Sequence, residues 1–301
     1  MHTQGAAEWI ETRDGRELYA QVLDGPFGNR GEEGSTDAAG TRGAVTVVFE
    51  AGYAAQRSTW APVQTRVAEF ARAVVYDRSG LGRSAPDPGG RSLERMAADL
   101  NDVLDHLGTG PFVLVGHSAG GPIVRAAAAN PQRRQEVIGL VLVDPSDEAA
   151  GFAMSRTTRL LEQVIEPIEL GLAKLGLFKP LFGKLLAAMP AEDVRADLDR
   201  EAFTPQVVRT QIQQTKTFIP ELRAWRQNAP DLGDIPVTVV SGALPGDGMI
   251  RKQRTAFVAA HATRAAASAR GRHVMAPNSA HYVPLTDADL VAAEVRRLAE
   301  A

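Results

Sequence analysis

Short, continuous apolar runs separated by helical stretches constrain the fold more than any other feature of this sequence. The runs are AVTVVFEAG (44–52), ARAVVYD (71–77), FVLVG (112–116), VIGLVLVD (137–144), IPVTVVSG (235–242) and RHVMAP (272–277). Runs without polar alternation are typical of strands buried on both faces. Helical stretches lie between them, such as residues 91–108, where Ser92 is a candidate N-cap and Gly108 a stop. This order predicts an α/β fold with a mostly parallel sheet and helices on both faces.

Two regions fall outside this alternation. Residues 8–24 predict two short strands around Asp14-Gly15, and the polar, glycine-rich stretch 25–43 predicts a surface loop. Residues 149–230 are helical in pattern, rich in leucine, and interrupted by prolines. We expect this segment to be a helical cap that divides the core into a first part, 1–148, and a second part, 231–301.

The length, charge and composition of the chain limit which partners, sites and locations are expected. A length of 301 residues suits one large α/β domain with an insertion. The net charge of −3, without obvious asymmetry, argues against a nucleic-acid or anionic-membrane partner. The absence of cysteine excludes disulfides, zinc-thiolate sites and thiol chemistry. Because no run of about 18 apolar residues and no secretion leader is present, we expect a cytoplasmic protein without a membrane span.

The motif Gly-His-Ser-Ala-Gly at 116–120 presents Ser118 as a candidate nucleophile. A nucleophile elbow is a tight turn from a buried strand into a helix, with no room for side chains beside the serine. The apolar run 112–116 precedes the motif, and Pro122, which suits the first turn of a helix, follows it. This context favours a catalytic serine over a serine in an ordinary glycine-rich turn.

A serine nucleophile needs a base, and His281 is the candidate base. It lies in NSAHYVPLTDADL, between the last predicted strand and the last predicted helix. The other histidines are predicted to be terminal or structural, and His117, inside the elbow, is expected to point away from Ser118. The pair Ser118 and His281 therefore predicts nucleophilic catalysis.

Four segments in this order resemble serine hydrolases of the α/β-hydrolase superfamily. They are VVFEAGY, YDRSGLGRS, GHSAGG and SAHYVPL. The resemblance covers most of the chain outside 149–230 and 25–43, and it implies the α/β-hydrolase fold with a cap inserted after the strand VIGLVLVD. It also implies an oxyanion hole formed by the backbone N–H of Ala119 and one from the loop after the strand 44–52. Where many members have His-Gly, this chain has Glu50-Ala51-Gly52-Tyr53, so the second donor is expected to be the Tyr53 N–H.

Two aspartates compete for the position behind His281. The resemblance most often places the acid after the strand 235–242, which indicates Asp247, and in some members at the end of the strand before the cap, which indicates Asp144. Asp144 ends a rigid buried strand, and functional groups of parallel sheets gather at the carboxyl ends of strands. We retain both residues as alternatives, with a slight preference for Asp144. Asp77 is predicted to be structural, bound to the turn backbone or to Arg78.

These residues together predict a hydrolase that cleaves a carboxylic ester, a lactone or a thioester through an acyl-enzyme on Ser118. No cofactor or metal is expected. The apolar content of 149–230 favours a small, hydrophobic substrate. A lyase or a perhydrolase of the same fold, or a ligand-binding protein that has lost turnover, is the alternative. Epoxide hydrolases and haloalkane dehalogenases of this fold usually have an aspartate where this chain has Ser118.

Overall fold

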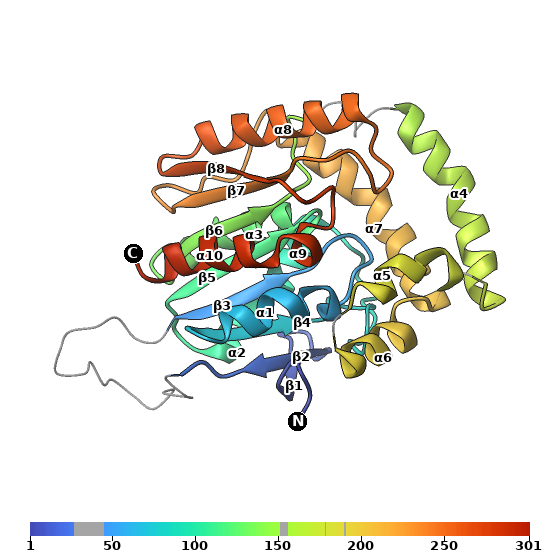
Figure 1. Cartoon of the computed structure of the whole chain (residues 1–301), viewed down its shortest axis with the longest axis horizontal. Helices are drawn as coiled ribbons and strands as arrows, with labels where there is room; N and C mark the ends of the chain where they lie inside the picture. Colours follow the sequence, from blue (N-terminus) through green and yellow to red (C-terminus); the bar gives the residue numbers. More distant parts are fainter. Residues whose placement is uncertain (27–44, 151–155, 178, 190) are drawn as a thin grey trace.

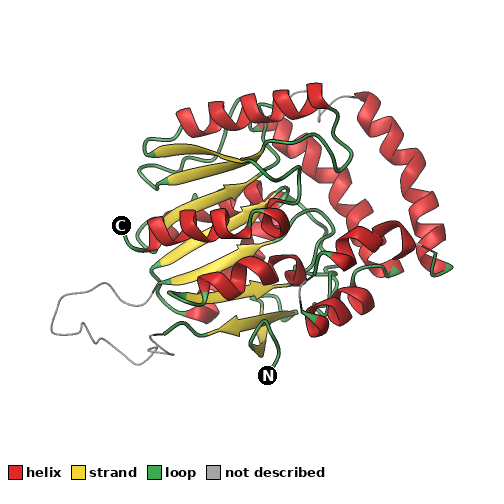
Figure 2. Ribbon diagram, viewed as in Figure 1, coloured by secondary structure: helices red, strands yellow, loops and turns green. Residues whose placement is uncertain are grey.

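The computed structural model describes residues 1–26, 45–150, 156–177, 179–189 and 191–301. An eight-stranded sheet in the order β1-β2-β4-β3-β5-β6-β7-β8 forms its centre (Figures 1 and 2). Strands β3 to β8 run parallel, and β1 and β2 are antiparallel at one edge, so the predicted fold class is confirmed. The strands are β1 (Ala6–Glu11), β2 (Glu17–Leu23), β3 (Thr46–Glu50), β4 (Arg72–Tyr76), β5 (Phe112–His117), β6 (Val137–Val143), β7 (Val237–Gly242) and β8 (Gly271–Ala276).

The amino-terminal hairpin forms where the sequence predicts it. Strands β1 and β2 pair from Ala6↔Val22 to Glu11↔Glu17, across a turn in which Gly15 takes φ 79°. A glycine at this turn avoids the steric strain that a side chain has at positive φ. The loop predicted over 25–43 lies, from residue 27 onward, outside the described residues.

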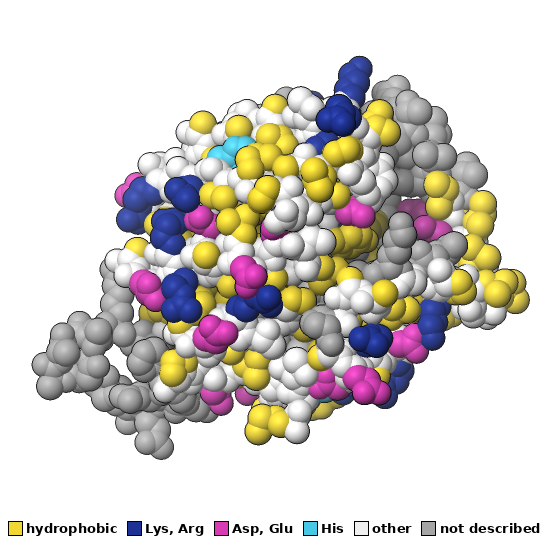
Figure 3. Space-filling view, viewed as in Figure 1, with side chains coloured by type: hydrophobic (Ala, Val, Ile, Leu, Met, Phe, Trp, Pro, Cys, Tyr) yellow, Lys and Arg dark blue, Asp and Glu magenta, His cyan; other side chains and the backbone are white. Residues whose placement is uncertain are grey.

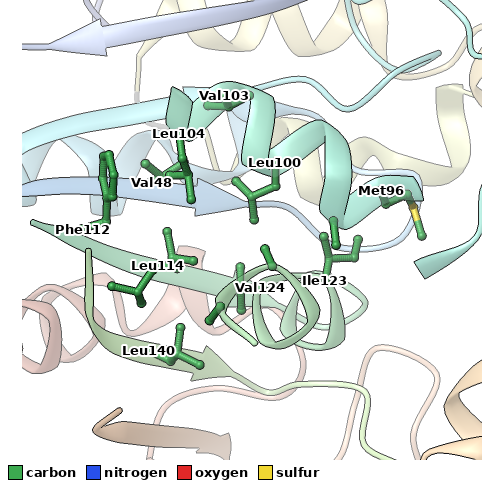
Figure 4. Close-up of a cluster of buried hydrophobic side chains, with 14 of the residues drawn as sticks. Val48, Met96, Leu100, Val103, Leu104, Phe112, Leu114, Ile123, Val124 and Leu140 are labelled. Carbon is green, nitrogen blue, oxygen red and sulfur yellow. The ribbon is translucent and has the colours of Figure 1, made fainter. Parts of the chain in front are cut away.

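Helices cover both faces of the sheet because successive strand residues point to opposite sides. On one face, α2 (Leu93–Leu107) and α3 (Gly120–Ala128) pack against Val48, Leu114 and Leu140 (Figure 4). On the other face, α1 (Ala61–Val67) and α10 (Ala288–Ala299) pack against the alternate strand residues, and these helices lie in front of the sheet in Figure 1. The sheet core is therefore buried from both sides.

The ends of α2 agree with the caps expected from the sequence. The Ser92 side chain accepts a hydrogen bond from the Arg95 N–H at 3.2 Å, which satisfies one of the free donors of the first turn. Gly108 ends the helix at φ 107°. Both predictions for this helix are confirmed.

The carboxyl ends of the central strands meet along one edge of the sheet. Glu50 of β3 is in register with Gly116 of β5, and His117 of β5 with Val143 of β6. The residue after each strand therefore emerges beside its neighbours. This edge brings Ala51, Ser118 and Asp144 together from distant parts of the sequence.

Among the described residues, four α-helices lie between β6 and β7, next to that edge (Figure 1). They are α4 (Arg156–Lys174), α5 (Gly183–Ala187), α6 (Glu192–Glu201) and α7 (Pro205–Ala224), with a 3₁₀ turn at Lys179–Phe182. They fall within the segment 149–230, of which residues 151–155, 178 and 190 lie outside the description. Helix α7 also reaches the core of the sheet through Phe218 and Leu222.

The outer side of this helical segment carries exposed apolar side chains. Ile165 and Ile168 of α4, with Leu175 and Leu177 just after it, are exposed, and hydrophobic side chains are visible at the right edge of Figure 3, over this part of the molecule. Within the described part of the chain, no helix combines the length and the apolar character needed to cross a bilayer.

A buried ion-pair network ties α6 to the sheet. The Arg57 guanidinium is fully buried and contacts Asp77 after β4 at 2.5 Å, together with Asp197 and Glu201 of α6 at 2.6 Å each. Pairing of this kind compensates the free-energy penalty of burying the charges. It fixes α6 to the core.

The contacts of Asp77 match one half of the sequence expectation. Its carboxylate accepts a hydrogen bond from the Arg83 N–H of the following turn at 3.2 Å, as predicted for a structural aspartate. Of the two predicted partners, the turn backbone is thus the one observed, and the ion pair is made with Arg57 rather than with Arg78. Arg57 takes that position, because the Arg78 side chain turns instead to Glu50 at the end of β3.

Candidate active site

Ser118 sits at a strained turn between β5 and α3. Its φ is 52°, in the left-handed region that serine seldom adopts. The turn is tight, since a Cβ on Gly116 would lie 2.5 Å from the Gly120 carbonyl oxygen, and a Cβ on Gly120 would lie 2.4 Å from that of Glu50. The glycines at both positions are therefore required by this geometry, which has the form of a nucleophile elbow.

His281 and Asp144 extend from Ser118 in a connected line. His281 lies in the loop between β8 and α9 (Val283–Thr286). Its Nε2 is 3.0 Å from Ser118 Oγ, and its Nδ1 is 2.7 Å from Asp144 Oδ2. The carboxylate can only accept, so Nδ1–H donates to it and Nε2 offers a lone pair to the serine hydroxyl. In this tautomer the imidazole can take the proton of Ser118.

Asp144 is held as an anion in a fully buried position. Its Oδ1 accepts hydrogen bonds from the Gly242 N–H at 3.0 Å and from Arg254 Nη1 at 2.6 Å. Burial alone would raise the pKa of the carboxyl group, but the hydrogen bond and charge of His281, the charge of His261 and the hydrogen bond from Arg254 outweigh it and hold the pKa well below its usual range. Asp144 is therefore ionised when it faces His281.

Sequence reasoning did not identify Arg254 as part of this site. The residue lies in α8 (Arg251–Ala266), 110 positions from Asp144, in a stretch with no motif. In the sequence it is only an arginine in the first turn of a predicted helix. The contact becomes visible only when α8 packs against β7.

Asp247 occupies a different position from Asp144. Its Oδ2 accepts a hydrogen bond from the His281 backbone N–H at 2.9 Å, and the Tyr282 N–H lies 3.4 Å away. The contacts of the imidazole are with Asp144 and Ser118. Of the two aspartates considered as the acid from the sequence, Asp144 thus contacts the imidazole ring of His281, and Asp247 contacts the backbone of the loop that carries this ring.

His117 lies against the loop that carries His281. The ring centroids of His117 and His281 are 4.8 Å apart, and His117 Nε2–H donates to the His281 carbonyl oxygen at 2.9 Å. Burial, with a smaller contribution from His281, lowers the pKa of His117 to about 3. A neutral His117 therefore supports this loop. That its side chain points away from Ser118 stays a prediction.

The loop after β3 is clamped by Arg78. Arg78 donates to the carbonyl oxygens of Ala51 and Gly52 at 2.5 and 2.6 Å, and it also binds the Glu50 carboxylate. Tyr76 donates a further hydrogen bond to Glu50. Glu50 thus anchors the loop, and its burial raises the pKa of its carboxyl group even though Arg78 opposes the rise.

A cavity of about 300 Å³ opens next to Ser118. Tyr53, Ser118 and His281 line it together with side chains of the helical segment between β6 and β7. The lining residues are Gly52, Tyr53, Ala54, Ala55, Gln56, Thr59, His117, Ser118, Glu169, Ala202, Phe203, Val207, Gln211, His281, Tyr282, Pro284 and Leu285. Ala119, next to Ser118, is buried at the start of α3. Among the described residues, no group of three or more His, Asp or Glu side chains could hold a metal ion.

A comparison with protein-family models agrees with the resemblance seen in the sequence. A family model described as "Alpha/beta hydrolase family" matches residues 47–294, which is most of the chain. The chain belongs to the alpha/beta hydrolase family.

Proteins of similar sequence match this chain over different lengths. A protein of the AB hydrolase superfamily from Gibberella zeae is 27% identical over 290 residues, covering 83% of this chain and 85% of that protein. YqjL from Bacillus subtilis is 32% identical over 34% of this chain, and the candidate carbamate hydrolase RutD from Azorhizobium caulinodans is 35% identical over 35% of it. The matched segment spans only 40% and 39% of the lengths of YqjL and RutD.

Solved structures of the same fold include more than one kind of hydrolase. The epoxide hydrolase CorEH has a TM-score of 0.70 at 19% identity, covering 97% of this chain and 98% of that one. An esterase from Thermogutta terrifontis has a TM-score of 0.62 at 19% identity, covering 97% of each chain. At this level of identity the likeness concerns the fold, so the chemistry has to be argued from the residues of this chain.

Proposed function

We propose that this protein is a serine hydrolase that cleaves a carboxylic ester, or a related lactone or thioester, through an acyl-enzyme on Ser118. The observation that carries the proposal is the unbroken line of contacts from Ser118 Oγ through His281 to the buried Asp144 carboxylate. A serine at the elbow, where an epoxide hydrolase of this fold usually has an aspartate, favours acyl transfer.

In the acylation step, Ser118 Oγ attacks the ester carbonyl carbon while its proton passes to His281 Nε2. The imidazolium that forms is stabilised by the Asp144 carboxylate. The negative charge on the former carbonyl oxygen is held by the N–H groups of Ala119 and Tyr53, with Arg78 fixing the carbonyls that precede Tyr53. The intermediate then collapses, and His281 gives its proton to the departing alkoxide, which leaves as the alcohol.

Deacylation repeats these steps with water as the nucleophile. His281 takes a proton from water as the oxygen attacks the acyl-enzyme carbonyl, and the same N–H groups hold the oxyanion. Collapse of the second intermediate breaks the bond to Ser118 Oγ, which recovers its proton from His281. The acid product leaves, and no cofactor or metal takes part in any step.

The helices between β6 and β7 would act as a cap, with 149–230 as its limits and 1–148 and 231–301 as the two parts of the core. Ala202, Phe203 and Val207 from these helices line the cavity beside Ser118. Their apolar surfaces favour a hydrophobic group on the substrate.

A series of p-nitrophenyl esters with acyl chains of increasing length tests the proposal. Wild type should release p-nitrophenol, and Ser118→Ala should lose activity by about 10⁶-fold in kcat. Ser268→Ala is the matched control and should keep wild-type activity, because this hydroxyl lies just after α8 and donates to the Arg264 carbonyl oxygen of that helix. Turnover that persists in Ser118→Ala would contradict the serine mechanism, and a preference for the shortest acyl chain would contradict an apolar cavity.

Carbamate hydrolysis is a second candidate, favoured by the similarity to RutD over 107 residues. A carbamate carbonyl can be attacked by Ser118 in the same way as an ester carbonyl. Matched p-nitrophenyl acetate and p-nitrophenyl carbamate decide between them. A higher kcat/KM for the carbamate would favour this candidate over the ester hydrolase.

A further inference from the structure

The described wall of the cavity beside Ser118 includes a charged residue that the reaction does not use. Among the described side chains that line the cavity, Glu169 alone belongs to Asp, Glu, Lys or Arg. It lies on α4, in the helical segment between β6 and β7, and its carboxylate accepts a hydrogen bond from Gln211 Nε2 at 3.1 Å. The proposed mechanism gives Glu169 no role.

The charge of Glu169 is not balanced by a cation among the described side chains. Partial burial raises the pKa of its carboxyl group, the Gln211 amide opposes the rise, and the nearby carboxylate of Glu166 adds to it. An amide can satisfy one oxygen of the carboxylate but cannot neutralise it. A partly buried carboxylate without a paired cation is stabilised best by a positively charged partner.

Aromatic residues accompany Glu169 around the cavity. Tyr53 and Tyr282 come from the loops that also carry the candidate oxyanion donor and His281, and Phe203 comes from the turn between α6 and α7. Faces of aromatic rings attract cations, and a carboxylate together with aromatic rings forms a common site for alkylated ammonium groups. Small apolar side chains such as Ala54 and Ala202 complete a wall that suits the methyl or methylene groups of such a cation.

We propose that the cavity selects esters carrying a positively charged amine, which pairs with Glu169 while its alkyl groups contact Tyr53, Phe203 and Tyr282. The substrate class is then a cationic amino ester or quaternary ammonium ester, and anionic esters are repelled. This inference rests on the proposed function, because it places the substrate between Glu169 and Ser118. Glu169 then determines which substrate charge the site accepts, in addition to the residues that carry out the reaction.

Matched pairs of substrates that differ only in charge test the inference. Acetylthiocholine and neohexyl thioacetate have the same shape, with a cation or a neutral carbon in the alcohol portion. The p-nitrophenyl ester of trimethylammonio-butyrate and its tert-butyl isostere make the same comparison in the acyl portion. The measured quantity is the ratio of kcat/KM for the cationic ester to that for its neutral isostere.

In wild type, this ratio should exceed one for at least one pair. In Glu169→Gln it should fall by about tenfold, mainly through a higher KM for the cationic ester, as expected for the loss of a partly desolvated charge contact. Glu166→Gln, one turn earlier on α4 and not part of the cavity wall, removes a nearby charge without removing the contact, so this matched control should change the ratio far less than Glu169→Gln does. An equal ratio in wild type and Glu169→Gln for both pairs would overturn the inference.

A binding measurement separates this inference from the proposed function. Calorimetry of acetylthiocholine with Ser118→Ala protein needs no turnover. Binding should be about tenfold weaker when Glu169→Gln is added to this background. If the neutral isosteres are not hydrolysed but this difference is found, the proposed function fails and the cation site stands. Absent or equal binding in the two proteins overturns the cation site, whatever the esters show.

Discussion

Replacement of Asp144 by asparagine separates the two carboxylates near His281. In the structure, Oδ1 of Asp144 faces two donors, the Gly242 N–H and Arg254 Nη1, and Oδ2 faces His281 Nδ1. Asparagine has one carbonyl oxygen and one amino group. The oxygen should take the side with two donors, because an amino group there would oppose both of them. The amino group then faces His281.

This arrangement predicts the size of the effect. An amide N–H that points at Nδ1 stabilises the tautomer in which Nε2 carries the proton, and that tautomer cannot accept the proton of Ser118. The loss in kcat should be about 10⁴-fold, which corresponds to about 5 kcal/mol of transition-state stabilisation. The fold should persist, since the asparagine oxygen keeps the hydrogen bonds to Gly242 and Arg254.

The control is the same substitution at Asp247. Asp247→Asn keeps a carbonyl oxygen that can accept from the His281 N–H, so kcat should stay within about tenfold of wild type. Burst and steady-state release of p-nitrophenol gives kcat for each variant, and circular dichroism with a thermal melt shows that each is folded. A folded Asp144→Asn protein with near wild-type kcat would refute the reasoning, as would a larger loss in Asp247→Asn.

Three further substitutions test contacts outside the Ser118–His281–Asp144 line. Arg57→Met should lower the free energy of unfolding in urea by about 3–5 kcal/mol, because it leaves the buried Asp77 carboxylate without its cation, whereas Asp197 and Glu201 keep Arg83. A loss below about 1 kcal/mol would contradict this. Arg78→Met should lower kcat at least about tenfold with a smaller effect on KM, because the hydrogen bonds to the Ala51 and Gly52 carbonyls are lost. An unchanged kcat would show that the loop keeps its conformation without Arg78. His117 has a folded pKa of about 3, so between pH 3 and its unfolded pKa the unfolded chain binds the proton that the native protein does not, and stability falls as pH falls. Between pH 8 and pH 5, the free energy of unfolding of His117→Gln should therefore fall by about 2 kcal/mol less than that of wild type. An identical pH dependence in the variant would count against a neutral, buried His117.

Local pattern in the sequence was enough for the architecture. The apolar runs require strands buried on both faces, and their alternation with helices requires parallel connections, whatever the details of packing. The caps of α2 and the turn at Asp14-Gly15 are set by residues within a few positions of each other. The same local rules predicted an elbow at Ser118, where the structure has a tight strand-to-helix turn with positive φ.

Long-range packing decided which side chains meet around that serine. Asp144 and Asp247 both follow buried strands, and only the packed fold places Asp144 against the His281 ring and Asp247 against its backbone. Arg254 approaches Asp144 across 110 positions, and Glu169 reaches the cavity from a helix with no motif. The physical reason is the same in each case. Neighbouring residues in the sequence determine whether a segment forms a strand or a helix. The partners of a buried charge, in contrast, are residues that folding brings within hydrogen-bond distance, and no local pattern in the chain encodes these partners.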